Sequence, residues 1–136
     1  MVLRSFTANE RELRMTHKVV PMIHVPDVRA TAVWYESIGF RLDGSHEDDG
    51  EMSWALLSFG ESEIMLNEGG APSAAHRREV DLYVHVDDVD ALYARLAGRV
   101  EIVHELYDAI YGMREFIIRD LNRFWITFGQ PRSDQA

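Results

Sequence analysis

Residues 24–36 read HVPDVRATAVWYE, and residues 85–97 read HVDDVDALYARLA. Both stretches follow a short apolar run, and both place His-Val-x-Asp-Val in front of a helical pattern. The two stretches lie 61 positions apart, which is close to half of the 136-residue chain. Because self-similarity at a fixed spacing is the signature of a repeated structural unit, the sequence predicts two copies of one unit.

The first copy is predicted to contain a strand, a helix and three further strands. The apolar run 19–25 is typical of a strand. Asp27 can accept hydrogen bonds from the first turn of a helix, whose apolar residues then recur at helical spacing until Gly39. One further strand is expected to begin at Phe40, and two more are expected over 52–59 and 62–67. Turns are expected at 47–50 and 60–61.

The second copy repeats this order, with a strand over 80–86, a cap at Asp88 and strands over 100–103, 114–119 and 124–128. We therefore expect an α+β domain of two βαβββ modules. A capping-box pattern at Thr7 to Glu10 predicts an additional short helix over 9–15. The expected division is an N-terminal extension (1–17), a first module (18–68), a linker (69–78), a second module (79–131) and a tail (132–136).

Composition limits the possible partners. The chain has 14 basic and 23 acidic residues, a formal charge of −9 and a single lysine, Lys18. Nucleic-acid binding is not expected, because it depends on neutralising phosphates. No cysteine is present, which excludes disulfides and thiolate chemistry. No apolar run approaches the roughly 18 residues that span a membrane, and no secretory signal is recognisable, so we expect a cytoplasmic protein without a membrane partner.

Three stretches together resemble the vicinal oxygen chelate superfamily, which includes glyoxalase I, extradiol dioxygenases, fosfomycin-resistance enzymes and bleomycin-resistance proteins. They are VPDV at 25–28 continuing to Gly-Phe at 39–40, VDDVDALY at 86–93, and YGMREF at 111–116 continuing through Arg-Asp at 119–120 to Gly129. The last stretch is most similar to the metal-free bleomycin-resistance branch. The resemblance implies that the modules curl into an incomplete barrel, that a ligand lies on the concave side, and that the chain forms a homodimer.

The resemblance also implies four positions for the divalent metal of the catalytic members. In this sequence they fall on Val20, Met65, Asp81 and Thr127. Only Asp81 offers a suitable ligand, because hard divalent ions prefer oxygen and nitrogen donors and a catalytic zinc usually needs three protein ligands. We therefore predict no metal and no cofactor. The sequence also departs from its relatives at 120–123, which read DLNR in place of the usual Asp-Pro-Asp-Gly.

Strand alternation predicts which side chains face the ligand. His24 and His85 are equivalent positions that could bind an acidic group or act as a base, or could only bond the next turn or face water. Tryptophan and tyrosine side chains could form a stacking platform for a flat or cationic ligand, or pack in the core. The candidate ligand-binding residues are His24, Trp54, Tyr83, His85, Tyr111, Glu115 and Trp125.

Glu115 and Arg114 are neighbours on a predicted strand, so only one of them can face inward. A buried Glu115 would be a carboxylate that binds a cation, or a general base with a raised pKa. The alternative is an ion pair at the rim of the barrel. Tyr111 and Gly112 are expected in a loop at the mouth of the cavity.

These patterns favour metal-free binding or sequestration of a small aromatic or cationic compound in the concave cavity. The alternative is a metal-dependent lyase, isomerase or dioxygenase with a rearranged site, built from His24, His85, Asp81 and Glu115. A regulatory domain that binds a partner through its sheet edges is a third possibility. The sequence leaves open whether the protein is an enzyme.

Overall fold

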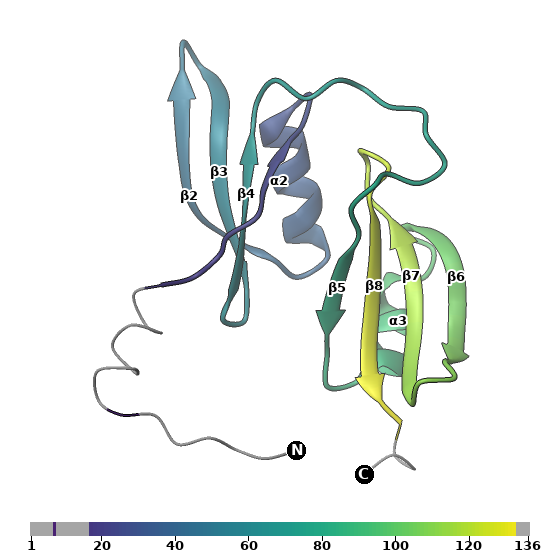
Figure 1. The fold of residues 1–136 in the computed structure, drawn as a ribbon. Coiled ribbons are helices and arrows are strands. Elements are labelled where there is room, and N and C mark those ends of the chain that lie inside the picture. Colours follow the sequence, from purple (N-terminus) through teal and green to yellow (C-terminus); the bar gives the residue numbers. More distant parts are fainter. Residues whose placement is uncertain (1–6, 8–16, 133–136) are drawn as a thin grey trace.

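The computed structural model describes residue 7 and residues 17–132 (Figure 1). The helix expected over 9–15 falls outside these residues. The first half contains β1 (Met22–His24), α2 (Val28–Ser37), β2 (Arg41–Asp48), β3 (Glu51–Phe59) and β4 (Ser62–Asn67). The second half contains β5 (Leu82–His85), α3 (Val89–Leu96), β6 (Glu101–Asp108), β7 (Met113–Arg119) and β8 (Trp125–Pro131). The predicted α+β fold of two βαβββ modules is confirmed.

Each module forms its own four-stranded sheet, and the sheets are not closed into a barrel. The strand orders are β1-β4-β3-β2 and β5-β8-β7-β6, so the two sheets have the same topology. The pairing of Met22 with Met65 in the first sheet corresponds to the pairing of Tyr83 with Thr127 in the second. In the same way, the pairing of Trp54 with Asn67 in the first sheet corresponds to the pairing of Glu115 with Gly129 in the second. Trp54 and Glu115 therefore occupy equivalent positions in the two modules.

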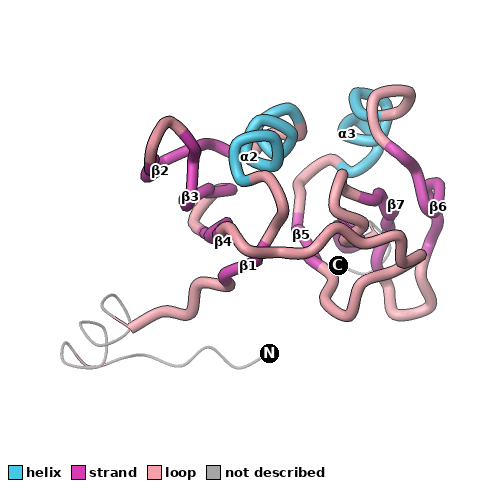
Figure 2. The backbone as a smooth tube through the Cα atoms, turned by 90° about the horizontal axis from the view of Figure 1, so that it is seen from above, coloured by secondary structure: helices cyan, strands magenta, loops and turns pink. Residues whose placement is uncertain are grey.

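The two helices begin in the same way and cover equivalent faces of their sheets. The Asp27 side chain accepts from the Ala30 amide at 2.9 Å, and the Asp88 side chain accepts from the Ala91 amide at 3.0 Å. These bonds satisfy donors that a helix leaves free in its first turn. Figure 2 shows both helices on the same side of the molecule. The opposite face of each sheet carries no helix from residues 17–132, and we call it the open face.

The apolar core lies on the sheet faces that the strand alternation predicts. Leu57 in β3 and Phe116 in β7 are fully buried in the core beneath the helices. Burying a side chain of this size stabilises the fold by roughly 1.5–3 kcal/mol. Alternate residues point to the other face, so Trp54 and Glu115 lie on the open faces. The other residues predicted to face the ligand have the same parity: Met22, His24, Met52, Leu56, Tyr83, His85, Ile117, Trp125 and Thr127.

The modules are joined by one buried and one partly buried hydrogen bond between α2 and the turn that precedes β8. The Tyr35 hydroxyl donates to Asp120 at 2.6 Å, and the Asn122 side-chain amide donates to the Thr31 hydroxyl at 2.9 Å. Asp120 also accepts from the backbone amides of Asn122 and Phe124, at 2.8 and 2.9 Å. The DLNR sequence thus still forms a tight turn, with Arg123 at a φ of 75° where relatives usually have glycine.

Some strand bounds differ from the prediction. β6 extends to Asp108 rather than ending at 103. Its register shifts between Ile102 and His104 and again between His104 and Tyr107, and such irregularities remove the alternation by which a strand is recognised. β1 is shorter than the run 19–25, because Pro21 has no amide hydrogen and contributes only its carbonyl, which accepts from Met65 at 2.8 Å.

Candidate functional site

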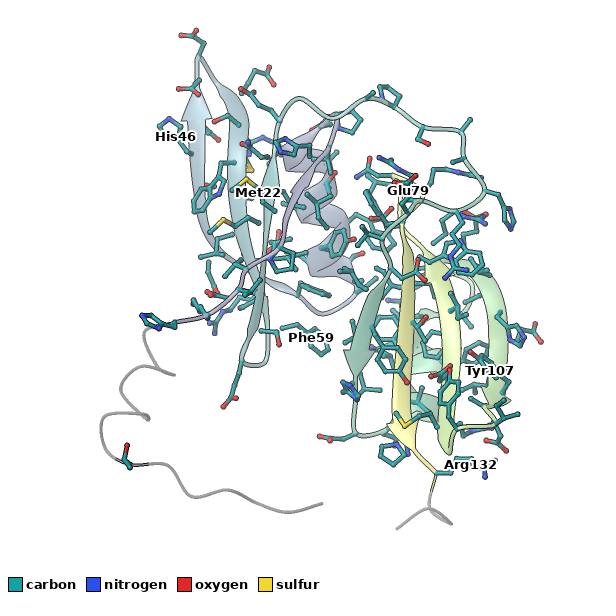
Figure 3. All side chains as sticks on the ribbon, viewed as in Figure 1. Met22, His46, Phe59, Glu79, Tyr107 and Arg132 are labelled. Carbon is teal, nitrogen blue, oxygen red and sulfur yellow. The ribbon has the colours of Figure 1, made fainter. Side chains whose placement is uncertain are left out.

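The open face of the second sheet contains a buried carboxylate. Glu115 lies in the middle of β7 and has no exposed surface. Three hydroxyls donate to it: Tyr83 to Oε2 at 2.5 Å, and Tyr107 and Tyr111 to Oε1 at 2.5 and 2.6 Å. These tyrosines come from β5, from β6 and from the turn between β6 and β7. We call Glu115 with Tyr83, Tyr107 and Tyr111 the Glu115 cluster; Figure 3 labels Tyr107 within it.

The local backbone explains why the cluster forms. The β6–β7 hairpin pairs Tyr107 with Glu115, and its turn contains Gly112 at a φ of 84°. The neighbouring position in β8 is Gly129, and a Cβ atom there would lie 2.2 Å from the Tyr83 hydroxyl. Glycine at this position therefore makes room for the phenol that reaches Glu115.

The cluster fixes the charge state of its carboxylate. Burial by itself raises the pKa of Glu115, but the hydroxyls of Tyr107, Tyr111 and Tyr83 stabilise the charged form and bring the pKa below its usual value. Glu115 is thus ionised at neutral pH. Burial, followed by the hydrogen bond to Glu115, raises the pKa values of Tyr83 and Tyr107 well above their usual range, so the phenols remain protonated donors.

Two hypotheses about Glu115 are therefore wrong. It is not a base with a raised pKa, because its three donors outweigh the effect of burial. It is not part of a rim ion pair with Arg114 either. Arg114 points to the other face of β7, where it binds Asp90 at 3.0 Å and Asp108 at 3.1 Å. The hypothesis of a buried carboxylate that can bind a cation remains.

The other candidate residues lie outside this cluster. His24 is exposed, and its Nδ1 lies 3.1 Å from the Glu68 carbonyl oxygen. His85 is exposed, with its ring centroid 5.0 Å from that of Tyr83. The Trp125 indole donates to the His76 carbonyl at 3.2 Å, and the guanidinium carbon of Arg77 lies 4.2 Å from its ring centroid. Trp125 thus holds the linker in place. Of the predicted residues, the structure brings together Tyr83, Tyr111 and Glu115, with His85 beside them.

Trp54 lies on the open face of the first sheet, which has a different chemistry. Its indole is half-buried and lies over Gly44, where an added Cβ atom would be 3.6 Å away. The direct cross-strand partners of Trp54 are His46 and Asn67. Its other neighbours on this face are apolar side chains with three thioethers, whereas the equivalent face of the second sheet has phenols and a carboxylate. These apolar neighbours are Met22, Met52, Leu56 and Met65.

The positions that hold a metal in catalytic relatives do not form a ligand set here. Val20, Met65 and Thr127 offer no strong ligand, and the Asp81 carboxylate is bound by the guanidinium of Arg77. Among residue 7 and residues 17–132, no three His, Asp or Glu side chains are grouped so as to hold a metal ion. The rearranged site proposed from His24, His85, Asp81 and Glu115 is therefore not assembled within this part of the chain.

A cleft of about 210 Å³ separates the two modules near the Glu115 cluster. It lies between β4 and the edge strand β5. Figure 3 labels Phe59, a lining residue, on the side of the first module that faces the second. Tyr83 belongs both to the wall of this cleft and to the Glu115 cluster. The cleft is lined by Phe40, Phe59, Ser62, Glu63, Ile64, Leu82, Tyr83, Val84 and His85. Within the described residues, no helix is long and apolar enough to cross a membrane.

The family model of the Glyoxalase/Bleomycin resistance protein/Dioxygenase superfamily matches residues 6–128. The chain belongs to this superfamily. Two similar solved structures are TioX from Micromonospora sp. ML1, with 25% identity and a TM-score of 0.67, and a protein of unknown function from Agrobacterium tumefaciens str. C58, with 27% identity and a TM-score of 0.67. The alignments cover 85% of this chain in both cases, and 97% and 94% of those chains.

A bleomycin-binding protein in complex with bleomycin has the same fold. It is 17% identical, with a TM-score of 0.64, and the alignment covers 85% of this chain and 99% of that chain. At this identity the likeness concerns the fold alone. A search of the curated proteins found no match.

Proposed function

We propose that this protein binds a small aromatic or cationic compound without a metal ion, in a cavity that two copies of the chain form together. The observation that carries the proposal is the Glu115 cluster. An ionised carboxylate surrounded by three aromatic rings, on the open face of its sheet, suits a ligand with both charge and a flat apolar surface.

The two open faces complement each other as walls of one cavity. Ligand sites are usually mostly apolar, with a few polar groups that fix orientation. The first sheet offers a mostly apolar wall around Trp54, with His46 and Asn67 as its polar members, and the second offers the polar groups of the Glu115 cluster. Within one chain, the helix α2 and the turn at Asp120 join the modules, and neither of these elements belongs to an open face. A second copy can therefore cover the second sheet with its own first sheet.

The comparisons and the metal positions support the same reading. The chain shares its fold with a protein that binds bleomycin. Three of the four expected metal positions have side chains that coordinate hard divalent ions poorly: Val20, Met65 and Thr127. This disfavours the metal-dependent alternative. A binding protein needs only the walls of the cavity, whereas a metal-dependent lyase, isomerase or dioxygenase needs a complete ligand set.

The first test is a binding measurement with chelator present. Aromatic cations, bleomycin among them, are titrated into the protein by calorimetry, and light scattering gives its oligomeric state. We expect a dimer that binds at least one such compound and loses affinity about tenfold or more in Trp54→Ala and in Glu115→Gln. Val33→Ala, on the exposed face of α2, is the matched control. A monomer, or binding that requires a divalent metal, would contradict the proposal.

Mixing the two variants tests whether the cavity is shared between copies. In a mixed dimer of Trp54→Ala and Glu115→Gln chains, one cavity receives both substitutions and the other receives neither. We expect mixing to restore high-affinity binding at half of the cavities in each mixed dimer. If each chain builds its own cavity, every cavity carries one substitution and mixing restores nothing.

A further inference from the structure

We propose that Tyr111 is a displaceable cap on Glu115, and that the ligand carries a protonated nitrogen, such as an amine or amidine, that replaces the Tyr111 hydroxyl. The inference rests on the proposed function and names the ligand class of the same site. It follows from the unequal positions of the three tyrosines around one carboxylate.

Tyr111 differs from the other two donors in exposure and location. It is 64% exposed, although its hydroxyl reaches a carboxylate with no exposed surface. Tyr107 is half-buried on β6, and Tyr83 lies on β5 with 43% exposure. A side chain that is mostly in solvent loses little packing when it rotates away. Tyr111 is thus the donor that leaves most easily.

The backbone of the turn holds its shape while the side chain moves. The Ala109 amide donates to the Met113 carbonyl at 2.7 Å, and the Gly112 amide donates to the Ala109 carbonyl at 3.2 Å. The Gly112 carbonyl in turn accepts from the Arg132 amide at 2.9 Å. Displacement therefore needs only a rotation of the Tyr111 side chain, which an exposed residue makes on the nanosecond timescale.

The exchange favours a cation over a neutral donor. The phenol and a cationic N–H both make charge-assisted hydrogen bonds to the Glu115 carboxylate. The cationic nitrogen adds the Coulomb attraction between two opposite charges, which is stronger at a buried carboxylate than in water, so it gains more from Glu115 than the phenol loses. Tyr83 and Tyr107 keep donating to the carboxylate and present their rings to the cation. The other cation on this face of β7, Arg119, is already bound to Glu101 and does not compete.

The test compares two probes with the same aromatic group. 1-Naphthylmethylamine is protonated at neutral pH, and 1-(methoxymethyl)naphthalene is neutral and has no donor. Tyr111→Phe keeps the ring and removes the competing hydroxyl, so we expect it to bind the amine about three- to tenfold more tightly and the ether within twofold of the original protein. Glu115→Gln is expected to weaken amine binding about tenfold or more without changing ether binding.

Tyr93→Phe is the matched control, because it removes a phenol hydroxyl on α3 that takes no part in the Glu115 cluster. We expect it to change amine affinity by less than twofold. The cap is refuted, while the proposed function remains supported, if both probes bind but Tyr111→Phe leaves amine affinity unchanged or Tyr93→Phe raises it equally. If neither probe binds the original protein or any variant at millimolar concentration, both the role of Tyr111 as a cap and the binding of this ligand class are refuted.

Discussion

Replacing Tyr35 by phenylalanine tests the hydrogen bond that joins the two modules. The Tyr35 hydroxyl donates to Asp120 at 2.6 Å, and the two side chains are 1% and 4% exposed. A hydrogen bond to a charged acceptor contributes about 1.5–3 kcal/mol. We therefore expect Tyr35→Phe to lower the free energy of unfolding by about 2 kcal/mol, which corresponds to a fall in Tm of roughly 7 °C for a chain of this size.

The effect has a defined pH dependence. Burial raises the pKa of Asp120 above its ordinary value of 3.8, despite the hydrogen bonds that lower it. The stabilisation from a raised carboxyl pKa is complete below the ordinary value and is lost as the pH rises through the folded value. Tyr35 opposes this loss by stabilising the ionised form. The cost of Tyr35→Phe is therefore largest at neutral pH, where Asp120 is ionised, and shrinks in acid as Asp120 becomes protonated.

Urea unfolding followed by tryptophan fluorescence measures this cost, at neutral pH and at about pH 4. A double-mutant cycle with Asp120→Asn isolates the pair. Tyr93→Phe on α3 is the matched control, because the Tyr93 ring packs against Phe116 and its hydroxyl has no partner among the described residues. We expect the control to change stability by less than about 0.5 kcal/mol. A Tyr35→Phe cost equal to the control, or undiminished in the Asp120→Asn background, would refute the reasoning.

Two further substitutions test close packing. Gly70→Ala places a Cβ atom 2.4 Å from the His24 carbonyl oxygen, so we expect a loss of about 1–3 kcal/mol in unfolding free energy, measured with urea. Arg119→Lys removes the planar group that donates to the His76 carbonyl at 3.1 Å. The linker then opens more often, and trypsin is expected to cut after Arg77 several-fold faster.

Each of these changes has a neighbouring control. Ala71→Ser alters the exposed residue next to Gly70 and should leave stability unchanged within about 0.5 kcal/mol. Arg41→Lys changes an arginine whose side chain is 80% exposed and should leave the trypsin cleavage rate unchanged. A stable Gly70→Ala protein would mean that the two backbone segments separate easily. An unchanged cleavage rate in Arg119→Lys would mean that Arg119 does not hold the linker.

Much of the fold could be predicted from sequence, because its signals are local. Asp27 and Asp88 mark the helix starts, and both act as caps. The alternation of apolar residues identifies the core face of β3 and β7. Where the alternation breaks, prediction failed: the register shifts in β6 hid its second half, and Tyr107 with it. The hairpin register between Tyr107 and Glu115 is a signal that could have found this residue.

The candidate site was only partly predictable. Tyr111 and Glu115 are four residues apart, and their proximity was foreseeable. Trp125 was expected in the ligand wall, but the His76 carbonyl and Arg77 engage its indole, and a contact across 49 residues leaves no local pattern. The predicted roles of His24, His85, Trp54 and Trp125 in ligand binding stay predictions.

The sequence by itself determined the duplicated βαβββ unit and the face on which each strand residue lies, because helix and strand periods depend only on near neighbours along the chain. Tertiary structure alone decided the state of Glu115. Its pKa depends on burial and on three hydroxyls, one of them 32 residues away in β5. A carboxylate's charge state is set by the groups that surround it in space, and only the packed sheet brings those groups together.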